Sequence, residues 1–279
     1  MIHIKTKIQT QFILYYLFLS VIPLIALSYY SYYNIKTNTQ KELVNSISFD
    51  MRQIQSSLDN LYTRFQKYTD ILSNSTVFYN AVVTTSNEIK KGDFKQAKYF
   101  AAINLEPQLK SLFATDEVIS AALVVIDGRV VYSYKDFVSI VNNYKDNPII
   151  RNTEDTPNMH WFSKQDNPFD SFEGEYTIVT KNIYDILGNN PTYSICQFII
   201  LIKQQKMSEI LDTHLRYADS LIRVIDENDN IIASNACDPQ TCDEHFNKIM
   251  PKKPFDQHAN TANYFDNYLF LQSYSSASN

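Results

Sequence analysis

The residues of this chain best suited to chemistry are two cysteines in one short loop. Cys237 and Cys242 are separated by four residues in the segment NACDPQTCDEH. Outside the cytoplasm such a pair can close a local disulfide bond. Possible metal ligands lie beside them, namely Asp238, Asp243, Glu244 and His245. A recognisable zinc site would also need a second, spaced pair of ligands, which is missing here. The pair is therefore a disulfide candidate, with free thiols or a metal site as the alternatives.

No arrangement of residues that carries catalysis occurs elsewhere in the sequence. The five histidines, at positions 3, 160, 214, 245 and 258, are scattered, and the G-x-S-x-G and H-E-x-x-H motifs do not occur. With only 4 glycines, the chain also lacks the glycine-rich phosphate-binding motifs. A net charge of −5 without a basic patch is atypical of nucleic-acid binding. We therefore expect no enzymatic activity, no cofactor, no resident metal and no nucleic-acid partner.

The N-terminal region predicts a membrane anchor. Residues 12–33 read FILYYLFLSVIPLIALSYYSYY and carry no charge, and about 20 such residues span the hydrocarbon core of a bilayer as a helix. Because Lys5 and Lys7 precede this segment, residues 1–11 should stay in the cytoplasm and everything after Tyr33 should lie outside the membrane. The alternative is a cleaved secretory signal, which has a shorter apolar core and a small-residue cleavage site. We predict a single-pass protein of the cell membrane.

A long amphipathic signalling helix is expected to follow the anchor, over residues 34–75. No proline or glycine interrupts it, and apolar residues recur at steps of three and four. This seven-residue repeat is typical of a helix that keeps one stripe against a partner. The stripe consists of Leu43, Ile47, Met51, Ile54, Leu58, Leu61, Phe65, Tyr68 and Leu72. It can pack on the rest of this chain, on a second protomer in a homodimer, or on both.

The remaining sequence predicts an α+β fold. Strand–turn–strand units are expected at 118–133 and 220–234, single strands at 176–184 and 193–203, and helices at 93–113 and 207–217. Asp127-Gly128 is a strong hairpin signal in the first unit. Cys196 lies in an apolar strand and should be buried. Because the strands form hairpins and the helices are separate from them, the sheets should be antiparallel.

Several segments of the chain occur in an order known from one family of receptors. They start with Ile22-Pro23-Leu24 in the anchor, its tyrosine-rich end and the long helix. Next come VVIDGRVVYS, His160-Trp161-Phe162 as a helix start, TIVTKNIYD, FIILIKQQKMSEIL and IRVIDENDNIIAS. In this order the chain resembles the extracytoplasmic double-Cache region of membrane sensor histidine kinases of the YesM type. The resemblance covers nearly the whole chain.

The resemblance implies two PAS-like modules after the long helix. The membrane-distal module would cover 76–215 and bind a small molecule, and the membrane-proximal module would cover 216–279 and be incomplete. In the family, a second transmembrane helix then leads to the kinase, and this sequence stops before such a helix. The expected function is therefore small-molecule sensing for a two-component histidine kinase. An AraC-type regulator, a chemoreceptor or a stand-alone anchored binding protein are the alternatives.

The resemblance also implies which residues line the distal pocket. By position, Trp161 and Phe162 match the aromatic pair of the family's pocket, and Tyr184 and Asp185 close the strand that faces it. Aromatic rings offer apolar area and cation–π contacts, and a carboxylate can hold an amine. Amino-acid-binding members have an arginine two residues before the tryptophan, where this chain has Met159, which argues against an amino-acid ligand. The alternative is that all four are ordinary core and turn residues.

Overall fold

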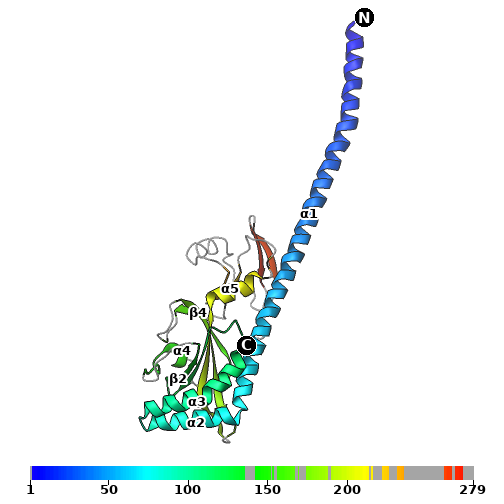
Figure 1. Ribbon diagram of the computed structural model, residues 1–279. Coiled ribbons are helices and arrows are strands. Elements are labelled where there is room, and N and C mark those ends of the chain that lie inside the picture. Colours follow the sequence, from blue (N-terminus) through cyan, green and yellow to red (C-terminus); the bar gives the residue numbers. More distant parts are fainter. Residues whose placement is uncertain are drawn as a thin grey trace.

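The computed structural model describes residues 2–135, 142–151, 153, 156–166, 169, 174–187, 190–213, 215, 222–225, 231–235, 261–265 and 268–272. In Figure 1 a mixed unit of helices and strands lies at one end of a long N-terminal helix. All strand pairs in the described residues are antiparallel. The predicted α+β class with antiparallel sheets is confirmed.

Helix α1 (Ile2–Ser73) is one continuous helix that contains both the predicted anchor and the predicted long helix. Pro23 lies inside it, as membrane helices tolerate. Its N-terminal part projects away from the rest of the molecule (Figure 1) and leaves apolar side chains exposed, with Phe12 at 72% and Leu19 at 80%. This part of α1 is long and apolar enough to cross a bilayer. Such exposure fits a membrane anchor, because water would otherwise meet a row of bare apolar side chains.

The apolar stripe of α1 packs on the chain's own domain. Four residues of the stripe are at most 3% exposed, namely Ile54, Leu61, Phe65 and Leu72, and the other five are half-buried. The buried four belong to one hydrophobic core with α2, α3, α5 and one face of the main sheet. Own-domain packing of the stripe is therefore confirmed, and a homodimer through α1 stays a prediction.

Two helices follow α1, and both begin with a side-chain cap. Ser75 accepts a hydrogen bond from the backbone N–H of Phe78 at 3.2 Å and starts α2 (Thr76–Lys90). Asp93 accepts one from the N–H of Gln96 at 3.0 Å and starts α3 (Phe94–Phe113). The structure confirms the helix expected at 93–113. Helix α2 lay outside the sequence-based predictions.

A five-stranded sheet in the order β2-β1-β5-β4-β3 forms the centre of the unit. Its strands are β1 (Ala121–Ile126), β2 (Arg129–Tyr134), β3 (His160–Asp166), β4 (Glu175–Asp185) and β5 (Asn190–Lys203). Asp127 and Gly128 form the β1–β2 turn with φ values of 49° and 72°. A Cβ on Gly128 would lie 2.7 Å from the Cβ of Lys145, so this position requires glycine. The first predicted hairpin and both single strands are confirmed.

Different elements pack on the two faces of this sheet. On the α1 face, α1, α2, α3 and α5 (Gln204–Asp212) pack over strand residues such as Val124, Val179 and Ile200. On the opposite face, which we call the loop face, a core of Leu123, Ile178, Ile199 and others lies under Ile149 and Ile150 of α4 (Pro148–Arg151) and under Phe169. Successive side chains of a strand point to opposite faces. Each strand therefore contributes to both cores.

The prediction that His160-Trp161-Phe162 begin a helix is wrong. These residues open β3, with His160 paired to Thr180 and Trp161 paired to Val179. The segment lies at the edge of the sheet, where β4 supplies backbone partners and aromatic side chains favour a strand. Helix α5 also begins three residues before the predicted 207–217 segment.

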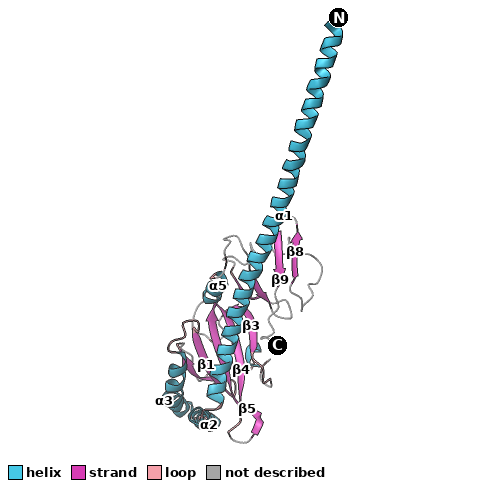
Figure 2. Cartoon of the chain, turned by 90° about the vertical axis from the view of Figure 1, so that its right-hand side faces the viewer, coloured by secondary structure: helices cyan, strands magenta, loops and turns pink. Residues whose placement is uncertain are grey.

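The C-terminal part contributes two further strand pairs. Strands β6 (Arg223–Ile225) and β7 (Ile231–Ser234) form the second predicted hairpin, and β8 (Thr261–Phe265) pairs with β9 (Tyr268–Gln272). Figure 2 shows the β8–β9 pair alongside α1. Cys237 and Cys242 lie outside the described residues, so their disulfide stays a prediction.

Candidate functional site

The structure separates the predicted ligand-binding residues. Trp161 lies on the α1 face, where its ring stacks on that of Phe65 with the centroids 6.0 Å apart. Phe162, the next residue, packs against the core of the loop face. Tyr184 is five positions beyond Val179, the partner of Trp161, which corresponds to about 17 Å along the strand. Trp161 and Phe162 thus point to opposite sides of the sheet.

Asp185 ends β4 and interacts with α2. Partial desolvation, and then the charge of the Asp185 carboxylate and a hydrogen bond to it, raise the pKa of Tyr79. Asp185 is one position beyond Tyr184, at the same end of β4 and away from the aromatic pair on β3. The four residues therefore do not form one common pocket in this structure, and their roles in ligand binding stay predictions.

A set of polar side chains that the sequence analysis did not single out lies on the loop face. This polar cluster consists of Thr153, Thr156, His160, Thr180, Asn182 and Gln197. Four of its members (153, 180, 182 and 197) are at most 6% exposed. In the sheet register His160 pairs with Thr180, and Asn182 pairs with Gln197. Three neighbouring strands, β3, β4 and β5, therefore bring these side chains together.

Hydrogen bonds tie the sheet to the segment that covers the polar cluster. Asn182 Nδ2 donates to the carbonyl oxygens of Thr153 and Thr156, to the latter at 3.0 Å. Gln197 Nε2 donates to the hydroxyl oxygen of Thr153. His160 Nε2 lies 2.6 Å from the hydroxyl oxygen of Thr156. Three strands thus hold residues 153 and 156 in place.

Two buried atoms of the polar cluster have no hydrogen-bond partner among the described residues: Thr180 Oγ1 and Gln197 Oε1. The orientation of the Gln197 amide follows from its hydrogen-bond acceptor, because Nε2 lies 3.5 Å from the carbonyl oxygen of Ile150, which can only accept. A buried polar atom without a partner costs about 1–3 kcal/mol. These two atoms give the polar cluster unused capacity to bind a hydrogen-bonding molecule.

No buried charged side chain lies at the polar cluster among the residues that the structure describes. Among the described residues, the buried ionisable carboxylates are Asp50 and Asp116. Asp50 is on α1, and Asp116 accepts a hydrogen bond from Tyr68 of α1 at 2.9 Å and pairs with Arg64 of α1 at 3.2 Å. Burial lowers the pKa of His160 from its ordinary value of 6.5, which favours the neutral ring. The described side chains thus supply hydrogen bonds to this site but no buried counter-charge.

A signal for this site was present in the sequence. In the buried strand segment TIVTKNIYD, Thr180 and Asn182 are polar residues two positions apart, and Gln197 interrupts the apolar run ICQFIIL. Polar residues with a period of two inside a buried strand must share one face. That pattern identifies the face of each strand, although it does not show which strands are neighbours.

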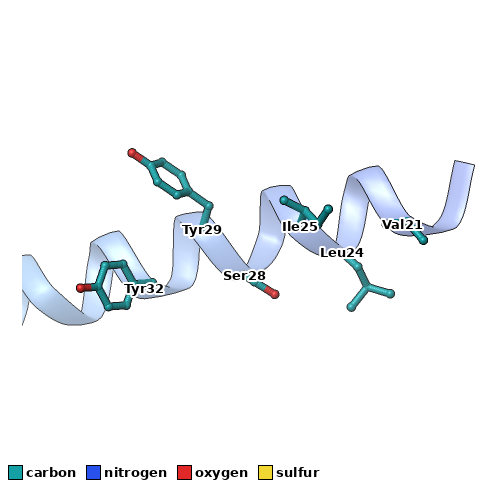
Figure 3. Close-up of a pocket in the computed structure, with 6 residues that line it drawn as sticks. All are labelled: Val21, Leu24, Ile25, Ser28, Tyr29 and Tyr32. Carbon is teal, nitrogen blue, oxygen red and sulfur yellow. The ribbon is translucent and has the colours of Figure 1, made fainter. Parts of the chain in front are cut away.

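Two hollows on the described surface lie away from the polar cluster, and both are less suited to a ligand. One lies on α1 inside the predicted membrane segment, and Figure 3 shows its six lining side chains projecting from a single helix: Val21, Leu24, Ile25, Ser28, Tyr29 and Tyr32. The other, between α1 and α5, is a shallow groove lined by Ser57, Asn60, Leu61, Arg64, Val118, Ile210 and Thr213. Its Arg64 is already paired with Asp116. No three histidine, cysteine or acidic side chains meet as a possible metal site in the described part of the chain.

Comparison with solved structures shows what kind of domain has this fold. The ligand-binding domain of the Campylobacter jejuni chemoreceptor Tlp3, in complex with L-valine, matches with a TM-score of 0.54 and 13% identity over 85% of this chain and 89% of that domain. The extracellular domain of vpHK1S-Z8, described as a histidine kinase, matches with a TM-score of 0.52 and 12% identity over 84% and 88% of the two chains. The chain has the fold of a receptor sensory domain. No protein-family model and no curated protein sequence matches it.

A sensory-domain fold agrees with two features of the sequence. Catalytic motifs do not occur in it, and the Tlp3 domain that shares the fold is a ligand-binding domain. The candidate membrane helix near the N-terminus fits a membrane-anchored receptor.

Proposed function

We propose that this chain is the extracytoplasmic small-molecule-sensing region of a transmembrane receptor, with the ligand bound at the polar cluster. The observation that carries the proposal is the pair of buried, unpartnered polar atoms, Thr180 Oγ1 and Gln197 Oε1, at the centre of the sheet. The Tlp3 domain, which shares the fold, is in complex with L-valine. A small molecule is therefore a reasonable occupant for a sensory domain of this architecture.

The proposed receptor has the order that the sequence predicts. Residues 1–11 are cytoplasmic, 12–33 cross the membrane, and 34–75 carry the signal. Residues 76–215 form the membrane-distal module of a double-Cache region and 216–279 belong to the membrane-proximal one. The proposed output is a YesM-type histidine kinase of a two-component system, because the order of segments resembles that family. A chemoreceptor is the second candidate, since the Tlp3 domain has the same fold.

Strand β3 offers a mechanical connection between the polar cluster and α1. Because neighbouring side chains alternate, His160 and Phe162 lie on the loop face while Trp161 between them reaches the α1 face. There its ring stacks on Phe65 of α1. A ligand that displaces His160 would therefore also move an aromatic contact with α1.

Strand β4 repeats this arrangement at the next residue of α1. Lys181 lies between Thr180 and Asn182, and its Nζ donates a hydrogen bond to Gln66 Oε1 at 2.8 Å. Gln66 Nε2 in turn donates to Asp70 at 3.0 Å. Contacts from two strands thus converge on consecutive α1 residues, and α1 runs without a break into the proposed membrane segment. Ligand binding would act by favouring one of two positions of α1.

The proposal can be tested on the full chain in lipid nanodiscs. Trp161 is the only tryptophan, so its fluorescence reports the contact between the sheet and α1. A library of amino acids, organic acids, sugars and nucleobases would be screened for compounds that raise the unfolding temperature. We expect at least one compound that stabilises the protein, changes Trp161 emission and binds less tightly to Thr180→Val.

The matched control is Thr85→Val, which removes another buried hydroxyl without a partner, but from α2. This variant should respond to the compound like the wild type. If no compound stabilises the protein, or if Thr180→Val and Thr85→Val respond alike, ligand sensing at the polar cluster is refuted.

A further inference from the structure

The two unpartnered atoms of the polar cluster belong to neighbouring residues of two paired strands. Thr180 pairs with Ile199, and Asn182 pairs with Gln197, so Thr180 and Gln197 are diagonal neighbours on adjacent strands. Such positions lie about 7–8 Å apart, and the side chains of long residues reach across this distance. Both side chains are on the loop face. A single polar group between them can therefore bind both.

The chemistry of the two atoms limits what that head group can be. Gln197 Oε1 can only accept, so the ligand must donate a hydrogen bond to it. Thr180 Oγ1 can both donate and accept. A carboxylate has no proton to donate and so cannot satisfy Gln197. An ammonium or amidinium group can donate, but it would bring a positive charge with it.

Among the described residues, a charged head group would also lack a buried partner at this site. The buried ionisable carboxylates in the described residues, Asp50 and Asp116, belong to or contact α1 rather than the loop face. Burying a charge without a partner is far more costly than burying a hydrogen-bonded neutral group. The charge distribution therefore favours an uncharged ligand over a cation or an anion.

Apolar side chains surround the polar atoms on the same face. Ile178 and Ile199 are fully buried on the sheet, and Ile149 and Phe169 cover them. Half-buried Phe162 packs at the edge of this core. A ligand that reaches Thr180 and Gln197 would lie against these side chains. Its body should therefore be apolar.

We propose that the polar cluster binds an uncharged ligand with an apolar body and a head group that both donates and accepts hydrogen bonds, as a carboxamide does. The proposal rests on the proposed function and names the ligand class of that same site. Gln197 Oε1 accepts from the ligand, and Thr180 Oγ1 forms the second hydrogen bond.

Benzamide, benzoate and benzamidinium test the ligand class, because they have nearly the same size and carry no charge, a negative charge and a positive charge. Each would be titrated into the full chain in nanodiscs and followed by saturation-transfer NMR, with empty nanodiscs to subtract binding to lipid. We expect benzamide to bind at least ten-fold more tightly than either ion. Loss of one hydrogen bond in Thr180→Val or Gln197→Leu should weaken it by about three- to ten-fold, whereas Thr85→Val should have no effect.

The outcomes separate this proposal from the proposed function. If benzoate or benzamidinium binds as tightly as benzamide and depends on Thr180, the site stands and the uncharged ligand class is overturned. If none of the three probes binds in a way that depends on Thr180 or Gln197, the ligand class is overturned too. The metabolite screen then decides separately whether the polar cluster binds any ligand at all.

Discussion

The same substitution at two threonines of β4 is expected to have different effects on the stability of the protein. Thr177 and Thr180 are both 0% exposed, and they lie three positions apart, so their side chains point to opposite faces of the sheet. Thr177 Oγ1 donates a hydrogen bond to the carbonyl oxygen of Ile232 at 2.8 Å. Thr180 Oγ1 has no partner among the described residues. Valine has almost the same shape as threonine, so each substitution removes little more than a hydroxyl group.

The expected change in the free energy of unfolding follows from these contacts. Thr177→Val breaks a buried hydrogen bond and removes a donor from Ile232, so it should lower stability by about 1–3 kcal/mol. Thr180→Val removes a buried polar atom that has no partner, so stability should stay unchanged or rise by up to about 2 kcal/mol. For a domain of this size, 1 kcal/mol changes the unfolding temperature by roughly 2–4 °C.

Urea unfolding of the full chain, followed by Trp161 fluorescence and far-UV circular dichroism, measures both variants. Agreement between the two probes would show that one transition is being observed. The reasoning is refuted if Thr180→Val destabilises the protein as much as Thr177→Val does. In that case the Thr180 hydroxyl is already paired in the ligand-free protein, and the main reason for placing a ligand at the polar cluster is lost.

Three further predictions concern the contacts around the sheet. Leu61→Asp buries a carboxylate in the core between α1 and the sheet. Circular dichroism should therefore show no cooperative unfolding transition for this variant. Trp161→Ala removes the ring that stacks on α1 and should cost about 2–4 kcal/mol in urea unfolding, less than a fully buried tryptophan because Trp161 is half-buried. The lowered pKa of His160 predicts a contribution to stability that is present above pH 6.5 and is lost as the pH falls below it. The variant His160→Gln should remove this contribution, as measured by unfolding curves between pH 8 and pH 5.

Each of these predictions has a matched control. Thr63→Asp places the same carboxylate on the exposed side of α1 and should leave unfolding cooperative. Trp161→Phe keeps an aromatic ring and should lose less stability than Trp161→Ala. For His160, the difference between the wild-type and variant pH curves excludes the other histidines. Native-like unfolding of Leu61→Asp, equal losses in the two Trp161 variants, or parallel pH curves would each contradict the corresponding argument.

The sequence pattern predicted those helices and turns that depend on residues close together in the chain. The stripe from Leu43 to Leu72 has the period of a helix with one buried side, and α1 buries that side. Asp127-Gly128 adopts the positive φ values that a tight hairpin turn needs. The helix start expected at His160-Trp161-Phe162 came from the family resemblance, and the strand that forms there depends on β4, a partner more than ten residues further along the chain.

The sequence by itself therefore determined the apolar N-terminal helix, the buried side of the long helix, the α+β class and most of the strands. The tertiary structure alone decided that Trp161 stacks on α1 while Phe162 faces away from it, and that Thr153, Asn182 and Gln197 meet in one polar cluster. The physical reason is the range of the interactions involved. Helical periodicity and turn geometry act within a few residues, whereas the polar cluster forms only when β5 pairs with β4 and β4 pairs with β3, and a one-residue change in that register would turn each side chain to the other face.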